Sequence, residues 1–310
     1  MKIQAPFGFV TGCHAGDRHI VQASLASMRH YAPQVPICLV VDGSFDVSDL
    51  EKEYKLFILR PAELEDKEMR QMLCGSFHAK QAALFEGPFE RFVWMDSDAI
   101  LWGDITDQIR QDIDFQILWN EVSIKSDEKN APPWLSHFYF NPEILSKIDP
   151  IFDWRGHPYF SAGVYAARRN VIRFEEYKKC IQWENAYPGL FAFGDMGILN
   201  YLILSKKRRG EIKVEMTDLQ HIPLFHGVDE IIKDCKGYYL SFPKKIKRPR
   251  ILHFCGKKPW IYDIRIFQFP YTIARLEHNK TKDNLVISFL KILWIDTRIL
   301  LTKIIKRFKK

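Results

Sequence analysis

The sequence predicts an α/β protein with a mostly parallel sheet flanked by helices. In the first half, short apolar runs of strand length alternate with amphipathic stretches of helical length. Gly, Pro and Asp close most of the apolar runs, as expected where strands end in turns. The chain has 310 residues, 47% hydrophobic and 27% charged, a balance that supports a full core and excludes a mostly disordered protein.

The elements of the first half follow from these runs. The expected strands cover residues 7–11, 37–41, 55–59 and 91–95. Helical spacing of the apolar residues predicts helices at residues 17–31 and 76–85. Ligands of such sheets lie outside the carboxyl ends of the strands. The residues that follow the strands, which include Gly12, His14, Asp42, Asp96 and Asp98, therefore mark the expected site.

The second half is less regular. Residues 121–160 are rich in Pro and aromatic residues and are expected to be irregular. Strands are expected at residues 163–168 and 251–254, and helices at residues 171–186 and 195–204. We see no internal repeat and no Ser/Gly linker. The simplest division is one domain over residues 1–280 and a helical tail over residues 281–310.

The segment Phe92-Val93-Trp94-Met95-Asp96-Ser97-Asp98 carries the clearest chemical signal. Two carboxylates, two positions apart, follow a buried strand, where their mutual repulsion needs a partner. A hard divalent cation with oxygen ligands supplies one. The alternative is a solvated turn that is acidic by chance. The apolar run before Asp96 favours metal binding.

Four further segments, in order along the chain, resemble motifs of nucleotide-sugar glycosyltransferases of the GT-A fold, and most of all those of glycosyltransferase family 8. They are Lys80, sixteen residues before Asp96; Ser161-Ala162-Gly163-Val164; Gly194-Asp195-Met196-Gly197-Ile198-Leu199-Asn200; and His253-Phe254-Cys255-Gly256-Lys257-Lys258-Pro259-Trp260. The resemblance covers residues 7–260. Met196 stands where the family usually has Gln, and the last block is one residue shorter.

The resemblance implies a GT-A type, Rossmann-like fold and a metal-dependent hexosyltransferase. The expected donor is a nucleotide-diphosphate sugar, UDP-sugar above all, and the expected acceptor a glycan or lipid-linked molecule. The family implies retention and a role in cell-surface polysaccharide or lipopolysaccharide synthesis. A cation such as Mn²⁺ or Mg²⁺ would stabilise the diphosphate leaving group.

Site residues follow from the resemblance and from the strand-end positions. The expected metal ligands are Asp96, Asp98 and His253, and the expected catalytic residues are Asp195 and Lys258. The expected donor-binding residues are Thr11, Gly12, His14, Asp42, Lys80, Ser97, Ser161, Gly163, Gly256 and Lys257.

Each assignment has a structural alternative. His253 could be a core imidazole, Lys80 a helix-surface lysine and Asp195 a helix N-cap. Lys257 and Lys258 could belong to a solvated basic face. An acceptor site or the core could equally use His221, His226, Trp134 and Trp154.

The tail carries most of the net charge. Eight basic and two acidic residues give residues 281–310 a charge of +6, out of +7 for the chain, so the body is not a basic nucleic-acid binder. A wide apolar face beside Lys291, Arg298 and Lys306 is typical of a helix at an anionic membrane surface. The alternatives are a helix that docks on the domain and a dimerisation helix.

Other features indicate the compartment and exclude other classes. The N-terminus has no apolar run for a signal peptide, no span is expected, and the six scattered cysteines are expected to be free. We therefore expect a cytoplasmic protein, peripheral at the inner face of the membrane. A haloacid-dehalogenase-type phosphatase would carry its Asp-x-Asp in the first strand, and a sugar nucleotidyltransferase would need a glycine-rich N-terminal loop. A non-catalytic membrane-bound sugar- or nucleotide-binding protein of the same fold remains the alternative.

Overall fold

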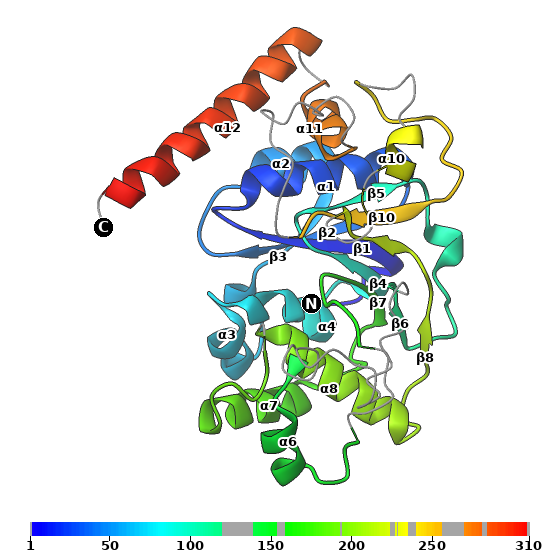
Figure 1. Cartoon of the computed structure of the whole chain (residues 1–310), viewed down its shortest axis with the longest axis vertical. Helices are drawn as coiled ribbons and strands as arrows, with labels where there is room; N and C mark the ends of the chain where they lie inside the picture. The colour runs from blue at the N-terminus through cyan, green and yellow to red at the C-terminus, as the bar shows by residue number, and fades with distance from the viewer. Residues whose placement is uncertain are drawn as a thin grey trace.

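The structure is a computed structural model with a seven-stranded sheet at its centre (Figure 1). It describes residues 2–119, 139–153, 159–192, 194–223, 227, 229–234, 240–255, 270–280 and 284–308. The strand order is β3 (Leu56–Leu59), β2 (Ile37–Asp42), β1 (Ala5–His14), β4 (Phe89–Met95), β7 (Val164–Arg168), β6 (Phe115–Ile117) and β8 (Val214–Met216). The strand β7 runs antiparallel to both of its neighbours, and the remaining pairs are parallel. The expected mostly parallel sheet is confirmed.

A second sheet of three strands lies beside the carboxyl end of β4. Its order is β5 (Ala99–Trp102), β10 (Arg250–His253) and β9 (Gln220–His221). The strands β10 and β5 are antiparallel, and His253 is paired with Ala99, the residue after Asp98. This pairing joins two parts of the chain that are far apart in sequence.

Helices cover both faces of the large sheet (Figure 1). Above it in this view lie α1 (Arg18–Tyr31), α2 (Ser48–Tyr54), α10 (Asp229–Asp234) and α11 (Pro270–Lys280). Below it lie α3 (Lys67–Leu73), α4 (Ala82–Glu86), α6 (Pro142–Ile148), α7 (Phe174–Ala186) and α8 (Asp195–Arg208). Short 3₁₀ turns occur at η1 (Pro61–Glu63), η2 (Phe77–Gln81) and η3 (Thr106–Gln108).

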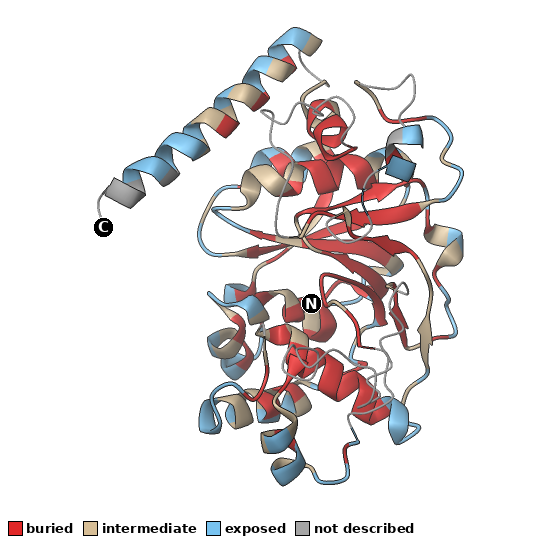
Figure 2. Cartoon of the chain, viewed as in Figure 1, coloured by how far each residue is buried: buried red, intermediate tan, exposed pale blue. Residues whose placement is uncertain are grey.

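Alternation along the strands divides the core into two main clusters. Side chains of successive strand residues point to opposite faces of a sheet. Val93 accordingly belongs to the cluster that includes Leu25 of α1, whereas Trp94 belongs to the cluster that includes Leu84 of α4. Figure 2 shows the buried sheet and the buried sides of the helices that face it.

Three expectations about the elements need correction. Residues 77–81 form the 3₁₀ turn η2, and the α-helix begins only at Ala82. The helix expected from residue 171 begins at Phe174, where the Glu176 side chain accepts a hydrogen bond from the Arg173 backbone N–H at 2.9 Å. Within the stretch expected to be irregular, α6 is helical, because the Asn141 side chain caps it. Residues 120–138 and 154–158 lie outside the described residues.

The tail forms one long helix, α12 (Leu285–Phe308), which packs on α11 at its N-terminal half (Figure 1). Arg275 of α11 donates two hydrogen bonds to the buried Asp296 carboxylate, at 2.6 and 3.1 Å, and Ile292 packs on Leu276 beside them. The opposite face is exposed and largely apolar. No helix within the described ranges is both long and apolar enough to cross a membrane.

Candidate functional site

A cavity of about 270 Å³ opens at the carboxyl ends of β1, β2 and β4. Its lining includes seven residues expected at the site: Gly12, His14, Asp42, Lys80, Asp96, Ser97 and Asp98. Phe77, Ser76, Cys13, Asp17 and Trp94 also line it. The convergence of strand ends predicted from the sequence is therefore present in the fold.

Asp96, Asp98 and His253 form a compact cluster at this cavity. One potential ligand atom from each lies within 4.8 Å of the others. The Nε2 atom of His253 is 3.3 Å from Asp98 Oδ1 and 3.9 Å from Asp96 Oδ2. Burial opposes protonation of the His253 imidazole, but the hydrogen bond and charge of Asp98, with the charge of Asp96, raise its pKa. A positive charge is therefore favoured at this point, whether from a proton or from a cation.

The donor set fits a divalent cation. Two carboxylates and one imidazole are ligands that Mn²⁺ accepts. Gly163 lies directly against the cluster, because a Cβ added there would overlap the His253 ring and lie 2.9 Å from Asp96 Oδ2. Its carbonyl oxygen accepts a hydrogen bond from the Asp96 backbone N–H at 2.8 Å. Because Gly163 has no side chain, the His253 ring and the Asp96 carboxylate can occupy the space beside it.

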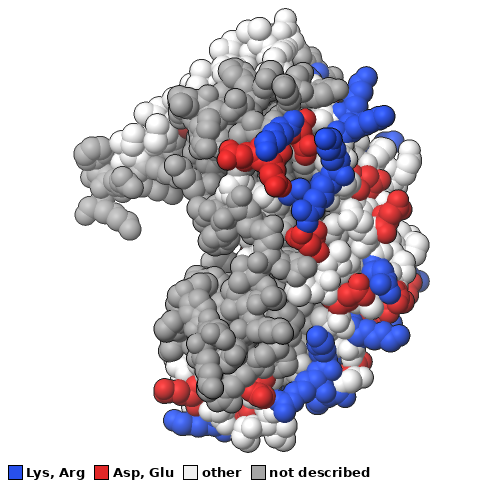
Figure 3. Space-filling view, turned by 45° about the vertical axis from the view of Figure 1, so that its right-hand side comes forward, with Lys and Arg blue, Asp and Glu red and all other residues white. Residues whose placement is uncertain are grey.

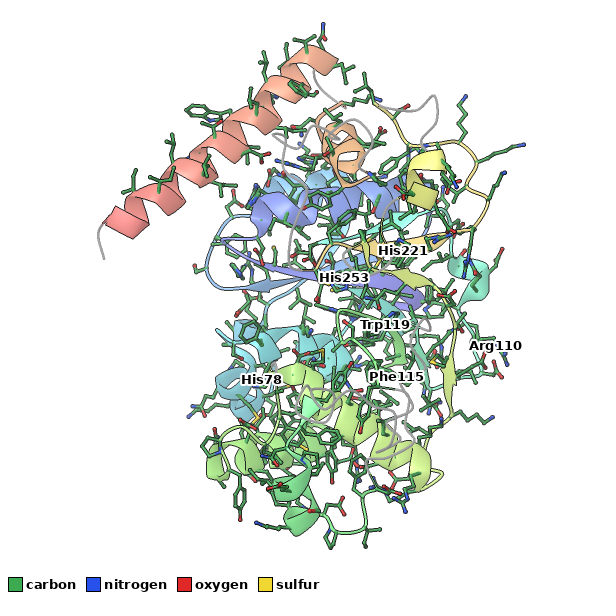
Figure 4. The ribbon with its side chains drawn as sticks, viewed as in Figure 1. His78, Arg110, Phe115, Trp119, His221 and His253 are labelled. Atoms are coloured by element: carbon green, nitrogen blue, oxygen red, sulfur yellow. The ribbon has the colours of Figure 1, made fainter. Side chains whose placement is uncertain are left out.

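Trp94 and Gln220 form hydrogen bonds with the cluster from within the fold, and neither was expected at the site from its sequence context. The Trp94 Nε1–H donates to Asp96 Oδ1 at 2.8 Å. The Gln220 amide nitrogen lies 2.8 Å from His253 Nδ1. Figure 4 shows His253 and His221 beside each other, on the paired strands β10 and β9 of the three-stranded sheet. The neighbouring His221 is engaged within the fold, through Gly227 O and Arg250.

Lys80 connects the cluster to helix α8. Its ammonium group lies 2.9 Å from Asp195 Oδ2 and 3.7 Å from Asp96 Oδ1, and it donates to the carbonyl oxygen of Ala162 at 3.2 Å. Its side chain is 17% exposed, so it is not a helix-surface lysine. Burial alone would lower the pKa of Lys80, but the two carboxylates raise it. Lys80 is held as a cation at the inner wall of the cavity.

Asp195 is the first residue of α8, where the helix dipole favours a negative charge. Gly194, not Asp195, occupies the N-cap position, with φ of +62°. The Gln81 side chain donates to Asp195 at 2.9 Å. Burial raises the pKa of the Asp195 carboxyl to about 6, while the charge of Lys80 opposes the shift and that of Asp96 adds to it. Asp195 is therefore a buried carboxyl that titrates near neutrality.

The remaining donor-binding candidates differ in their burial and in their hydrogen-bond partners. The Asp42 carboxylate accepts a hydrogen bond from the Gly75 N–H, and His14 pairs with Asp17 at 3.1 Å. Thr11 is fully buried in β1 and is not part of the cavity lining. The Ser161 hydroxyl lies 3.4 Å from the Gly163 N–H.

Six other residues considered for the donor or acceptor site lie outside the described residues: Gly256, Lys257, Lys258, His226, Trp134 and Trp154. Among the motif residues that are described, Asn200 has a structural role. Its side-chain amide bonds both the N–H and the carbonyl of Phe160, which fixes the segment before Ser161 on α8.

The sheet order and the strand-end cavity belong to a GT-A type fold, as the sequence motifs predict, and two solved structures share it. The galactosyltransferase LgtC, crystallised with donor and acceptor sugar analogues, is similar to this chain with a TM-score of 0.51 and 14% identity, over 92% of this chain and 97% of that chain. The glycosyltransferase GlyE of Streptococcus pneumoniae TIGR4 matches with a TM-score of 0.51 and 15% identity, over 92% of this chain. This chain spans 63% of GlyE. No protein-family model and no curated protein matches the chain.

Proposed function

We propose that this protein is a metal-dependent glycosyltransferase that moves a hexose from a nucleotide-diphosphate sugar to a glycan or lipid-linked acceptor. The observation that supports it most strongly is the cluster of Asp96, Asp98 and His253 at a strand-end cavity of a GT-A type fold. A UDP-sugar as donor, retention at the anomeric carbon and a role in cell-surface polysaccharide or lipopolysaccharide synthesis complete the proposal.

The residues at the cavity have complementary roles in this reaction. Asp96, Asp98 and His253 would hold Mn²⁺ or Mg²⁺, which stabilises the departing diphosphate. Lys80 brings a further positive charge to the same wall, at a point where negative charge develops on the leaving group. Asp195 orients Lys80 and is the proposed hydrogen-bond acceptor for donor-sugar hydroxyls. Lys258 is proposed to contact the diphosphate.

Donor binding is proposed for the other strand-end and motif residues. Gly12, His14, Asp42 and Ser97 lie on the cavity lining, which supports contacts to the base, ribose or phosphates. Thr11, Ser161, Gly163, Gly256 and Lys257 complete the proposed set.

A nucleotide-sugar panel tests the proposal. Release of nucleoside diphosphate is measured for wild type, for Asp98→Asn and for the control Asp107→Asn, which changes an exposed carboxylate of η3. We expect turnover of at least one UDP-sugar with Mn²⁺, its loss in Asp98→Asn and its retention in Asp107→Asn. Turnover in the presence of a chelator would refute metal dependence. Mn²⁺-dependent binding without turnover of any donor, across a panel of glycan acceptors, would favour the non-catalytic alternative.

We further propose that α12 lies on an anionic membrane surface, at the cytoplasmic face. The face of α12 that points away from α11 exposes Val286, Ile287, Leu290, Trp294, Leu300, Leu301, Ile304 and Ile305, and Lys291 and Arg298 adjoin it. Apolar burial together with about 1 kcal/mol for each basic residue near the surface would give binding. On the described part of the face shown in Figure 3, basic and acidic side chains are interspersed. The proposed partners are therefore substrate and membrane, not nucleic acid.

Vesicle sedimentation separates the membrane proposal from a purely intramolecular role. Leu290→Glu with Trp294→Glu should reduce binding to anionic vesicles. Ile151→Glu, which changes an exposed apolar residue on the body, should not. Equal binding to neutral and anionic vesicles, unchanged by salt and by the double substitution, would contradict the proposal.

A further inference from the structure

Gln220 is a buried polar side chain that contacts the metal cluster through the His253 ring. It is 1% exposed, and its amide nitrogen Nε2 lies 2.8 Å from His253 Nδ1. Its carbonyl oxygen Oε1 is buried and has no hydrogen-bond partner among the described residues. A buried carbonyl oxygen without a hydrogen-bond donor costs free energy, so in this orientation Oε1 of Gln220 destabilises the fold.

The backbone around Gln220 holds the side chain in place. The strand β9 pairs in parallel with β10, with Gln220 opposite Ile251, two residues before His253. The Gln220 N–H donates to the carbonyl oxygen of Leu118 at 2.5 Å. The amide can therefore exchange its oxygen and nitrogen by a half-turn without movement of the strand.

The two amide orientations select different forms of the His253 ring. With Nε2 of Gln220 donating to Nδ1, the neutral imidazole carries its proton on Nε2, which points at Asp98. In that form Nε2 cannot bind a cation. With Oε1 facing the ring, Nδ1–H donates to Oε1 and Nε2 presents a lone pair to the space between Asp96 and Asp98. The proton has changed from Nε2 to Nδ1 and the net charge of the ring is unchanged. The carbonyl oxygen has gained a donor and the amide nitrogen has lost its bond to Nδ1, so it is cation binding at Nε2 that favours this form.

We propose that Gln220 is a positioning residue for the divalent-cation site: its carbonyl oxygen accepts the Nδ1–H of His253 and so holds the ring in the form that binds a cation through Nε2. This inference rests on the proposed function to the extent that the cluster binds a divalent cation. Partners of this kind on a metal-ligating histidine typically contribute about 10–100-fold to metal affinity. The expected occupant is Mn²⁺ or Mg²⁺ at the three described ligands, as the donor set indicates.

Direct Mn²⁺ titration, followed by the electron paramagnetic resonance signal of the free ion, tests the inference on the full-length protein without any substrate. Gln220→Met keeps length and volume but removes the acceptor, and should weaken binding about 10–100-fold. Gln220→Glu keeps an acceptor for Nδ1–H and should bind like wild type. The matched control is Gln116→Leu, which removes another buried glutamine, bonded to Gln108 O and to Thr217 far from the cluster. It should leave Mn²⁺ affinity unchanged.

The form of the ring is read separately, by nitrogen NMR of histidine-labelled protein without metal, at a pH where the His253 ring is neutral. Wild type and Gln220→Glu should show a larger fraction of His253 protonated at Nδ1 than Gln220→Met. Equal Mn²⁺ affinity in Gln220→Met and wild type, or equal weakening in Gln220→Met and Gln220→Glu, would overturn the inference. If Asp98→Asn abolishes Mn²⁺ binding while Gln220→Met does not alter it, only the role of Gln220 fails. If wild type itself binds no Mn²⁺, the metal-dependent function fails together with it.

Discussion

Removal of the Lys80 charge should strongly destabilise the fold, because Lys80 lies between two carboxylates, of which Asp195 has little access to water. Its ammonium group lies 2.9 Å from Asp195 and 3.7 Å from Asp96, and the Asp195 side chain is only 5% exposed. Loss of one partner from a buried ion pair typically costs about 3–5 kcal/mol. We expect Lys80→Met to lower the free energy of unfolding by about 3 kcal/mol, at the low end because Asp96 is 32% exposed and can be solvated.

The loss of stability caused by Lys80→Met should grow with pH. The pKa of Asp195 is about 6 with Lys80 present, and loss of the neighbouring cation raises it further. A carboxyl with a raised pKa in the folded state loses stability as pH rises from its unfolded to its folded pKa. The difference in the free energy of unfolding between Lys80→Met and wild type should therefore widen from about pH 6 upward. Above that pH only the folded variant still binds the proton on Asp195.

A double-mutant cycle by urea unfolding at pH 6 and pH 8 measures the coupling. Lys80→Met combined with Asp195→Asn should recover about 2–3 kcal/mol relative to the sum of the single changes, at the upper end of coupling between contacting residues. The exposed pair Arg110 and Asp112, 51% and 61% exposed, should show about 0–1 kcal/mol in the same cycle. Additive effects for Lys80 and Asp195, with no widening at higher pH, would refute the reasoning.

Three further changes should have specific effects. Gly163→Ala should weaken Mn²⁺ binding about 10–100-fold, because its Cβ displaces the His253 ring, and an unchanged titration would contradict this. Arg275→Leu should increase hydrogen exchange in the N-terminal half of α12, because the buried Asp296 carboxylate loses the Arg275 guanidinium. The double substitution Arg275→Leu with Asp296→Leu should restore protection. Exchange that the single substitution leaves unchanged would contradict this role of Arg275. The kcat/KM of donor turnover should fall as pH drops through about 6, because protonated Asp195 no longer holds Lys80 by charge, whereas a flat profile across that pH would exclude this role.

The sequence predicted five of the seven strands of the main sheet, because these are continuous apolar runs. The strands β6 and β8, of three residues each, were not expected. The strand β4, with the pair Asp96 and Asp98 after it, and the late strand β10 were found from their apolar runs, and the resemblance then marked His253 as a metal ligand. The antiparallel direction of β7 could not be predicted, since apolar content alone does not distinguish the direction of a buried strand.

The contacts that complete the site depend on pairings distant in sequence. The strand β9 has only two residues, too short for any periodic pattern, so Gln220 gave no signal. The Trp94 side chain looked like part of a buried strand, and its indole N–H became informative only once Asp96 was placed beside it. Lys80 was placed near the diphosphate by resemblance, but its pairing with Asp195 needs the contact between η2 and α8. The tail was expected to lie on a membrane surface, with docking on the domain and dimerisation as the alternatives. In the structure, α12 packs on α11 by one face and exposes the other.

The location of a bound cation tests the central claim most directly. A crystal of the wild-type protein grown with Mn²⁺ and UDP, measured at a wavelength where Mn²⁺ scatters anomalously, shows where the ion binds. The account predicts an anomalous peak for an ion that is coordinated by Asp96, Asp98 and His253. The diphosphate should be a further ligand of this ion, in the cavity lined by Gly12 and Lys80. A peak elsewhere, or UDP bound in this cavity with no ion at the three residues, would contradict it.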